Sequence, residues 1–123
     1  MLARLEAPEV LSELSQAQAQ LQAQEAALVE QTTRARASRL IYNRILQTAK
    51  MEGAVSANEL DQAQIKMQAD SAMVAVSKGT VQAARSNYQA KSELRQYLTI
   101  TAPFDGMITE RNISPGALVG ARD

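Results

Sequence analysis

Few residues in this chain carry side chains suited to catalysis or metal binding. Its 123 residues include no cysteine and no histidine. Zinc sites built from those two residue types are therefore excluded, as are serine–histidine and cysteine–histidine nucleophile pairs. No phosphate-cradling loop is recognisable either. We expect no catalytic residue, no cofactor and no enzymatic activity.

Methionines and neighbouring carboxylates are the remaining candidates for chemistry. Thioether sulfur suits Cu(I), and Met67 and Met73 lie close together in the sequence. Met67 also belongs to an apolar repeat, so packing is its expected role and no metal site is predicted. Glu59 and Asp61 lie where a helix is predicted to begin, and the helix dipole favours negative charge there.

The charge balance and hydropathy of the chain exclude two further classes. Thirteen basic and thirteen acidic residues give a net charge of zero, whereas a nucleic-acid binder needs a basic face to neutralise phosphates. No apolar run approaches the roughly 20 residues that span a bilayer. We therefore expect no nucleic-acid partner. The chain reads as a fragment of a longer protein, so we expect targeting information to lie outside it.

Apolar residues repeat every seven positions in two stripes, which is the pattern of a coiled coil. Reflection through the point between Ala54 and Val55 superimposes one stripe on the other, so that Leu28 falls on Val81. This mirror symmetry predicts one helix folding back along another, with both stripes facing the seam between them. The stripes are Leu14, Leu21, Leu28, Ala35, Tyr42 and Ala49, then Leu60, Met67, Val74, Val81 and Tyr88.

Residues 53–56 separate the two predicted helices. The first should run from Pro8 to about Met51, a stretch without internal proline or glycine. Gly53 can adopt the left-handed conformation that ends a helix. Ser56 and Glu59 have the spacing of a capping box, in which each side chain bonds the backbone N–H of the other. The second helix is therefore predicted from residue 57 to about residues 95–97.

The period changes after Gln96, where short alternating segments predict strands at 98–102, 107–113 and 117–119. So few strands cannot bury a core alone, and residues 1–7 are the internal segment that could pair with them. The predicted fold is mainly α: a long antiparallel two-helix coiled-coil hairpin, with a small β region formed by both termini.

The tail carries a resemblance to a known family. Residues 102–106 read Ala-Pro-Phe-Asp-Gly, and residues 115–119 read Pro-Gly-Ala-Leu-Val. Residues 98–119 resemble the second half of the lipoyl-like domain in periplasmic adaptors, the HlyD-like membrane-fusion proteins of tripartite efflux pumps. The resemblance implies three parts: the end of a first lipoyl-like half at 1–7, an α-hairpin at 8–97, and the start of the second half at 98–123.

The resemblance also implies a function in transport. Such adaptors lie in the periplasm, associated with the inner membrane, and connect an inner-membrane transporter to an outer-membrane channel. They assemble into a ring, and the hairpin tip contacts the channel. In this chain the implied contact residues at the tip are Ala49, Gly53, Ala54, Val55, Ser56 and Glu59.

Two alternatives stay open at the level of sequence. Many adaptors carry Arg, then Leu four positions later and Ser seven positions after that, whereas here Ile45 and Ala49 precede Ser56. Ser56 could therefore contact a channel or act only as a helix cap. The alternative function is a structural coiled-coil spacer or oligomerisation module without a role in transport, although a spacer has no need of the turn-and-strand pattern at 98–119.

Overall fold

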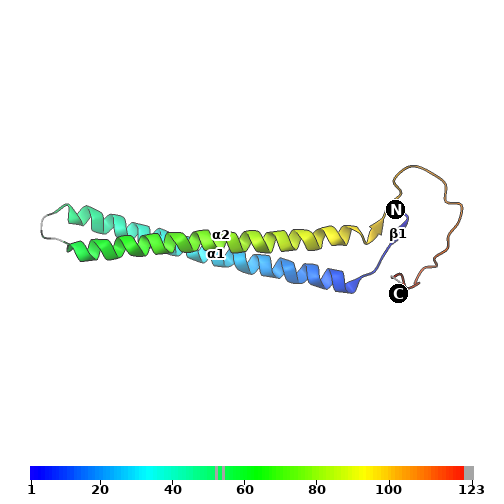
Figure 1. The fold of residues 1–123 in the computed structure, drawn as a ribbon, viewed down its shortest axis with the longest axis horizontal. Coiled ribbons are helices and arrows are strands. Elements are labelled where there is room, and N and C mark those ends of the chain that lie inside the picture. The colour runs from blue at the N-terminus through cyan, green and yellow to red at the C-terminus, as the bar shows by residue number, and fades with distance from the viewer. Residues whose placement is uncertain (52, 54, 121–123) are drawn as a thin grey trace.

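Two long helices lie side by side for most of the length of the molecule (Figure 1). The computed structural model describes residues 1–51, 53 and 55–120. Helix α1 spans Pro8–Ala49 and helix α2 spans Ala57–Gln96. A two-stranded sheet of β1 (Ala3–Arg4) and β2 (Thr99–Ile100) joins the two ends of the hairpin. The predicted fold class, a mainly α antiparallel hairpin with a small β region at the termini, is confirmed.

Both helices begin where local chemistry favours a start. Pro8 occupies the first turn of α1, where its missing N–H is not needed. Ser56 caps α2. Helix α1 ends at Ala49, two residues before the predicted end at Met51. Gly79 lies inside α2, and a Cβ built at this position would meet no atom within 4 Å, so no close approach of another backbone requires a glycine there among the described residues.

The seam between the helices contains a second stripe on each arm, displaced by three residues from the first. Together the two stripes give the alternating three- and four-residue spacing of a two-helix coiled coil. All members of the second stripe are buried or half-buried. They are Val10, Ala17, Gln24, Gln31, Ser38 and Ile45 on α1, and Ala63, Asp70, Ser77, Ala84 and Lys91 on α2.

The outward faces of both helices are polar or carry small side chains, with isolated exposed apolar residues such as Val29, Leu40 and Ile65. Glutamine, alanine and charged residues occupy most of these positions. Neither helix in the described ranges combines the length and hydropathy needed to cross a bilayer.

The two termini meet at the end of the hairpin opposite the loop. Strands β1 and β2 are antiparallel, with Ala3 opposite Ile100 and Arg4 opposite Thr99. Two further backbone bonds extend the ladder: the Leu2 N–H donates to the Ile100 carbonyl at 2.8 Å, and the Leu5 N–H to the Leu98 carbonyl at 2.7 Å. The expected pairing of the termini is therefore confirmed.

The strands predicted at 107–113 and 117–119 are wrong for this structure. These segments run as extended, exposed chain without strand pairing among the described residues. A strand is stabilised by ladder bonds to a neighbouring strand, and β1 and β2 are the strands that pair among the described residues. A turn does form between them, since the Ala117 N–H donates to the Ser114 carbonyl at 3.1 Å and Gly116 has φ +82°.

Candidate partner-binding tip

The connection between the helices lies at the far end of the hairpin from both termini (Figure 1). Helix α1 tightens as it ends, because the Lys50 N–H donates to the Gln47 carbonyl at 3.3 Å and the Met51 N–H to the Thr48 carbonyl at 3.0 Å. These bonds span three residues rather than the four of an α-helix. The last described turn of α1 therefore narrows towards the loop.

Gly53 reverses the chain direction. Its φ is +76°, in the left-handed region where a Cβ is strained. A Cβ built at this position would have no atom within 4 Å. Glycine is therefore required by the backbone conformation and not by crowding from the described residues.

Ser56 and Glu59 form the predicted capping box. The Glu59 N–H donates to Ser56 Oγ at 3.2 Å, and the Ser56 N–H donates to Glu59 Oε2 at 3.1 Å. Ser56 Oγ also lies 3.3 Å from Glu59 Oε2 and donates to it. The hydroxyl thus both accepts and donates inside the loop, which confirms its role as a cap and limits its capacity to bind a partner.

The other tip residues differ in exposure. Ala49 and Val55 are half-buried, whereas Ser56 and Glu59 are exposed. Ala54 lies outside the described residues. Sequence reasoning did not include Met51 among the contact residues, although its side chain is 69% exposed. Its position beside the loop was the available signal.

The described residues of the tip combine apolar side chains with a few polar groups. Its described side chains are small or apolar, apart from Lys50, the capping pair and the polar first turn of α2. No group of three or more potential metal ligands occurs in the described parts of the chain. The described part of the loop therefore presents both apolar and polar side chains at the end of the hairpin.

The predicted seam residues all lie on the inner faces of the helices. Leu14 and Val81 are buried. The others are half-buried, namely Leu21, Leu28, Tyr42, Leu60, Met67, Val74 and Tyr88. Met73, by contrast, is exposed on the outside of α2. The two methionines considered as metal ligands therefore occupy different faces of one helix.

Polar members of the second stripe were missed by sequence reasoning. Ser38 is 3% exposed, and its hydroxyl donates to the Ala35 carbonyl at 3.1 Å. Asp70 Oδ2 is buried without a hydrogen-bond partner, and Lys66 Nζ lies 3.8 Å away. Their three-residue offset from the apolar stripe was the signal that could have located them.

Two ion pairs connect the helices in the half of the hairpin nearest the termini. Arg85 Nη2 lies 3.1 Å from Glu25 Oε1, and Lys91 pairs with Glu13. Exposed pairs of this kind contribute little to stability, about 0–1 kcal/mol each. They nevertheless show which residues of α1 and α2 face each other.

No family model matches the chain, and no curated protein and no solved structure is significantly similar to it.

Proposed function

We propose that this chain is the hairpin of a periplasmic adaptor, which connects an inner-membrane transporter to an outer-membrane channel. The observation that carries the proposal is the separation of the two ends of the molecule. Both termini leave from one end, where β1 and β2 pair, and the loop lies at the other. Because α1 has 42 residues, the ends are about 63 Å apart.

This geometry suits a part that reaches across a gap. The paired termini would connect to the rest of an adaptor, and the loop would meet the channel. The resemblance of residues 98–119 to the lipoyl-like half of the HlyD-like family supports this orientation. A spacer would need the two helices but would not need that tail.

The tip contact proposed here is made by shape and apolar surface. Ser56 is the one residue that fits the three-residue tip pattern of many adaptors, and its hydroxyl is bonded to Glu59. Gly53, Val55 and Met51 are therefore the proposed contact residues, because they combine open backbone with apolar side chains. Ala49 would support the loop from beneath.

Acidic and basic residues occupy different halves of each helix, and this distribution favours side-by-side assembly of copies. On α1, residues 8–30 include four acidic and no basic residues, and residues 31–49 include four basic and no acidic residues. On α2 the order is reversed, since acidic residues dominate 57–77 and basic residues dominate 78–96. The α1 edge of one hairpin is thus complementary to the α2 edge of a parallel neighbour.

Small side chains on the outer edges would allow such neighbours to approach closely. Both edges carry exposed, mostly small residues at alternating three- and four-residue spacing, interrupted on α1 by the charged Glu30 between Ala26 and Thr33. These are Ala19, Ala23, Ala26, Thr33, Ala37 and Leu40 on α1, and Ala69, Ala72, Val76, Gly79, Ala83, Ser86 and Ala90 on α2. Self-association into a ring is therefore part of the proposal, with the α1 edge of each copy against the α2 edge of the next.

Site-specific photo-cross-linking in cells of the source organism tests this function. A cross-linking amino acid at Val55 should capture an outer-membrane channel protein. The same amino acid at the exposed Ala83, about two thirds of the way along α2, should capture a second copy of the chain instead. Cross-links from position 55 to cytosolic proteins alone would contradict both the transport role and the periplasmic location.

A further inference from the structure

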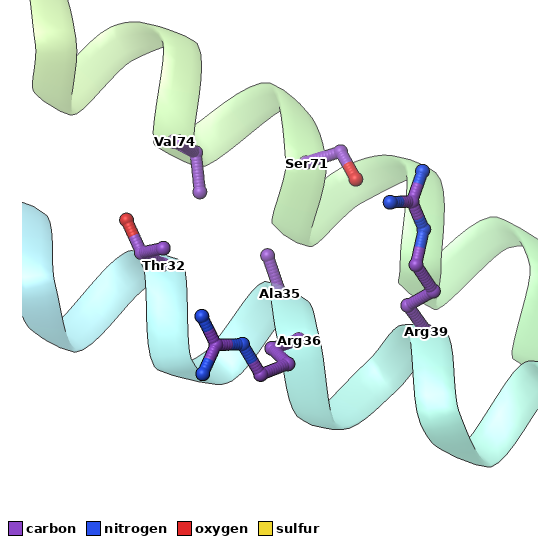
Figure 2. Close-up of a pocket in the computed structure, with 6 residues that line it drawn as sticks. All are labelled: Thr32, Ala35, Arg36, Arg39, Ser71 and Val74. Atoms are coloured by element: carbon purple, nitrogen blue, oxygen red, sulfur yellow. The ribbon is translucent and has the colours of Figure 1, made fainter.

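A hollow of about 280 Å³ opens between the two arms near the middle of the hairpin. It is distinct from the tip and lies on one broad face of the molecule. Figure 2 shows Ala35 of α1 between the two arms, with the Arg36 guanidinium beside α1 and the Arg39 side chain extending from α1 towards Ser71 of α2. Its lining is Thr32, Ala35 and the two arginines from α1, with Ser71 and Val74 from α2.

The register of the helices brings a third cation to this hollow. Glu25 faces Arg85 across the same broad face. Counting one heptad towards the loop on both arms places Thr32 opposite Lys78. A second heptad places Arg39 opposite Ser71, and Figure 2 shows these two side chains close to one another. Lys78 follows Val74 by one helical turn, so it lies at the end of the hollow that is nearer the termini.

The cationic side chains at this hollow form no ion pair with any other residue that the structure describes. The ion pairs in the described parts of the chain join Glu30 to Arg34, Glu25 to Arg85 and Glu13 to Lys91, and Asp70 to Lys66. None of them involves Arg36, Arg39 or Lys78. Asp70 is the nearest carboxylate in sequence to Ser71, but it lies in the seam and is directed to Lys66.

One hydroxyl group of the hollow is available as a donor. The Thr32 hydroxyl already donates its hydrogen to the Leu28 carbonyl at 2.7 Å, so it has none left for a carboxylate. Ser71 makes no side-chain hydrogen bond within the described residues, so its hydroxyl is free to donate to a ligand. Arginine presents planar paired N–H groups that match carboxylate oxygens in a bidentate arrangement.

We propose that this hollow binds carboxylate side chains from an acidic segment of a protein partner. Arg36 and Arg39 would each form paired hydrogen bonds to a carboxylate, and the Ser71 hydroxyl would donate a further hydrogen bond. The hollow is shallow and open, whereas a site for a small molecule encloses most of its ligand. Three cations without an aromatic side chain do not form the long basic track of a nucleic-acid site. Small wall residues offer no apolar anchor for a membrane.

Binding of a fluorescent ten-glutamate peptide to the whole chain tests the proposal. We expect the Arg36→Gln/Arg39→Gln variant to lose at least about tenfold in affinity, a free-energy change of about 1.4 kcal/mol. The matched control is Arg44→Gln/Arg95→Gln, which removes two cations that also lack ion pairs in the described residues. It should change affinity less than about twofold if local geometry matters more than net charge. Circular dichroism checks that all variants keep their helix content.

Three results would overturn the proposal. The first is equal loss of peptide binding in both double variants, which would mean non-specific attraction. The second is a failure of the wild-type chain to distinguish the glutamate peptide from a ten-glutamine peptide. The third is tighter, Arg36- and Arg39-dependent binding of inorganic phosphate, an RNA oligonucleotide or phosphatidylglycerol vesicles, which would identify another class of ligand.

Discussion

Val81 and Val76 allow the packing of the seam to be tested with one chemical change at two positions of the same helix. Val81 is 6% exposed in the seam, whereas Val76 is 60% exposed on the outside of α2. Replacing valine by alanine removes the equivalent of two methylene groups. At the seam this costs about 1.6 kcal/mol of burial free energy, at about 0.8 kcal/mol per group.

Helix propensity acts in the opposite direction at both sites. Alanine is favoured over valine in a helix by about 0.5 kcal/mol, so Val81→Ala should lower the free energy of unfolding by about 1 kcal/mol. For a chain of this length the corresponding fall in Tm is about 4 °C. At Val76 the small loss of burial and the gain in propensity cancel, so Val76→Ala should leave the Tm nearly unchanged.

Thermal unfolding followed by far-ultraviolet circular dichroism measures both variants against the wild type. The test is the difference in Tm between the two variants, because errors common to both measurements cancel in it. If Val76→Ala lowers the Tm as much as Val81→Ala does, or if neither changes it, the assignment of Val81 to the seam is refuted.

The same unfolding assay can test substitutions at four further positions. Gly53→Ala should destabilise the hairpin by about 1 kcal/mol, because the φ of Gly53 is +76°. Gly79→Ala should stabilise it by about 1 kcal/mol, because Gly79 lies in the interior of α2 with room for a Cβ. Changes in Tm of the same sign for the two variants would contradict the loop geometry. Ser56→Ala should cost about 1 kcal/mol through loss of the Glu59 N–H bond, and a smaller loss in Ser56→Asp is the control. One oxygen of the Asp70 carboxylate is buried and has no hydrogen-bond partner, so the apolar side chain of Asp70→Leu should raise the Tm. A lower Tm would mean that Asp70 is bonded in solution.

The arms and the loop could be predicted from sequence because their signals are local. Large apolar residues at seven-residue spacing define one stripe without knowledge of the partner helix. Gly53, Ser56 and Glu59 specify a helix stop and start within a few positions, and the structure forms the predicted cap. Mirror symmetry then follows from the arms having nearly equal lengths.

The second stripe was not predicted because its residue types do not identify a seam. Gln24, Gln31, Ser38 and Asp70 are polar, and only contact with the other helix removes them from solvent. Burial of such residues depends on tertiary packing and not on their own propensity. The sequence pattern therefore described half of the interface between the arms.

The hollow at Arg36 and Arg39 lay beyond sequence reasoning for a related reason. Their nearness to Ser71 depends on the register between the helices, which follows from the loop and the packing of the seam and is visible in the Glu25–Arg85 pair. For the tail, the sequence predicted a structure that does not form. Residues 107–113 have a strand-like pattern but no partner strand among the described residues. Local pattern cannot supply a hydrogen-bonding neighbour.

Proximity of positions 25 and 85 is the most direct test of the central claim, that the chain doubles back at residues 53–56 with its arms in this register. The chain has no cysteine of its own, so a Glu25→Cys/Arg85→Cys variant carries two unique thiols for a short bifunctional cross-linker. We expect efficient cross-linking within one chain, and little in Glu25→Cys/Lys66→Cys, where the second thiol lies about 28 Å further along α2. Equal cross-linking in both variants, or cross-links only between chains, would contradict the hairpin.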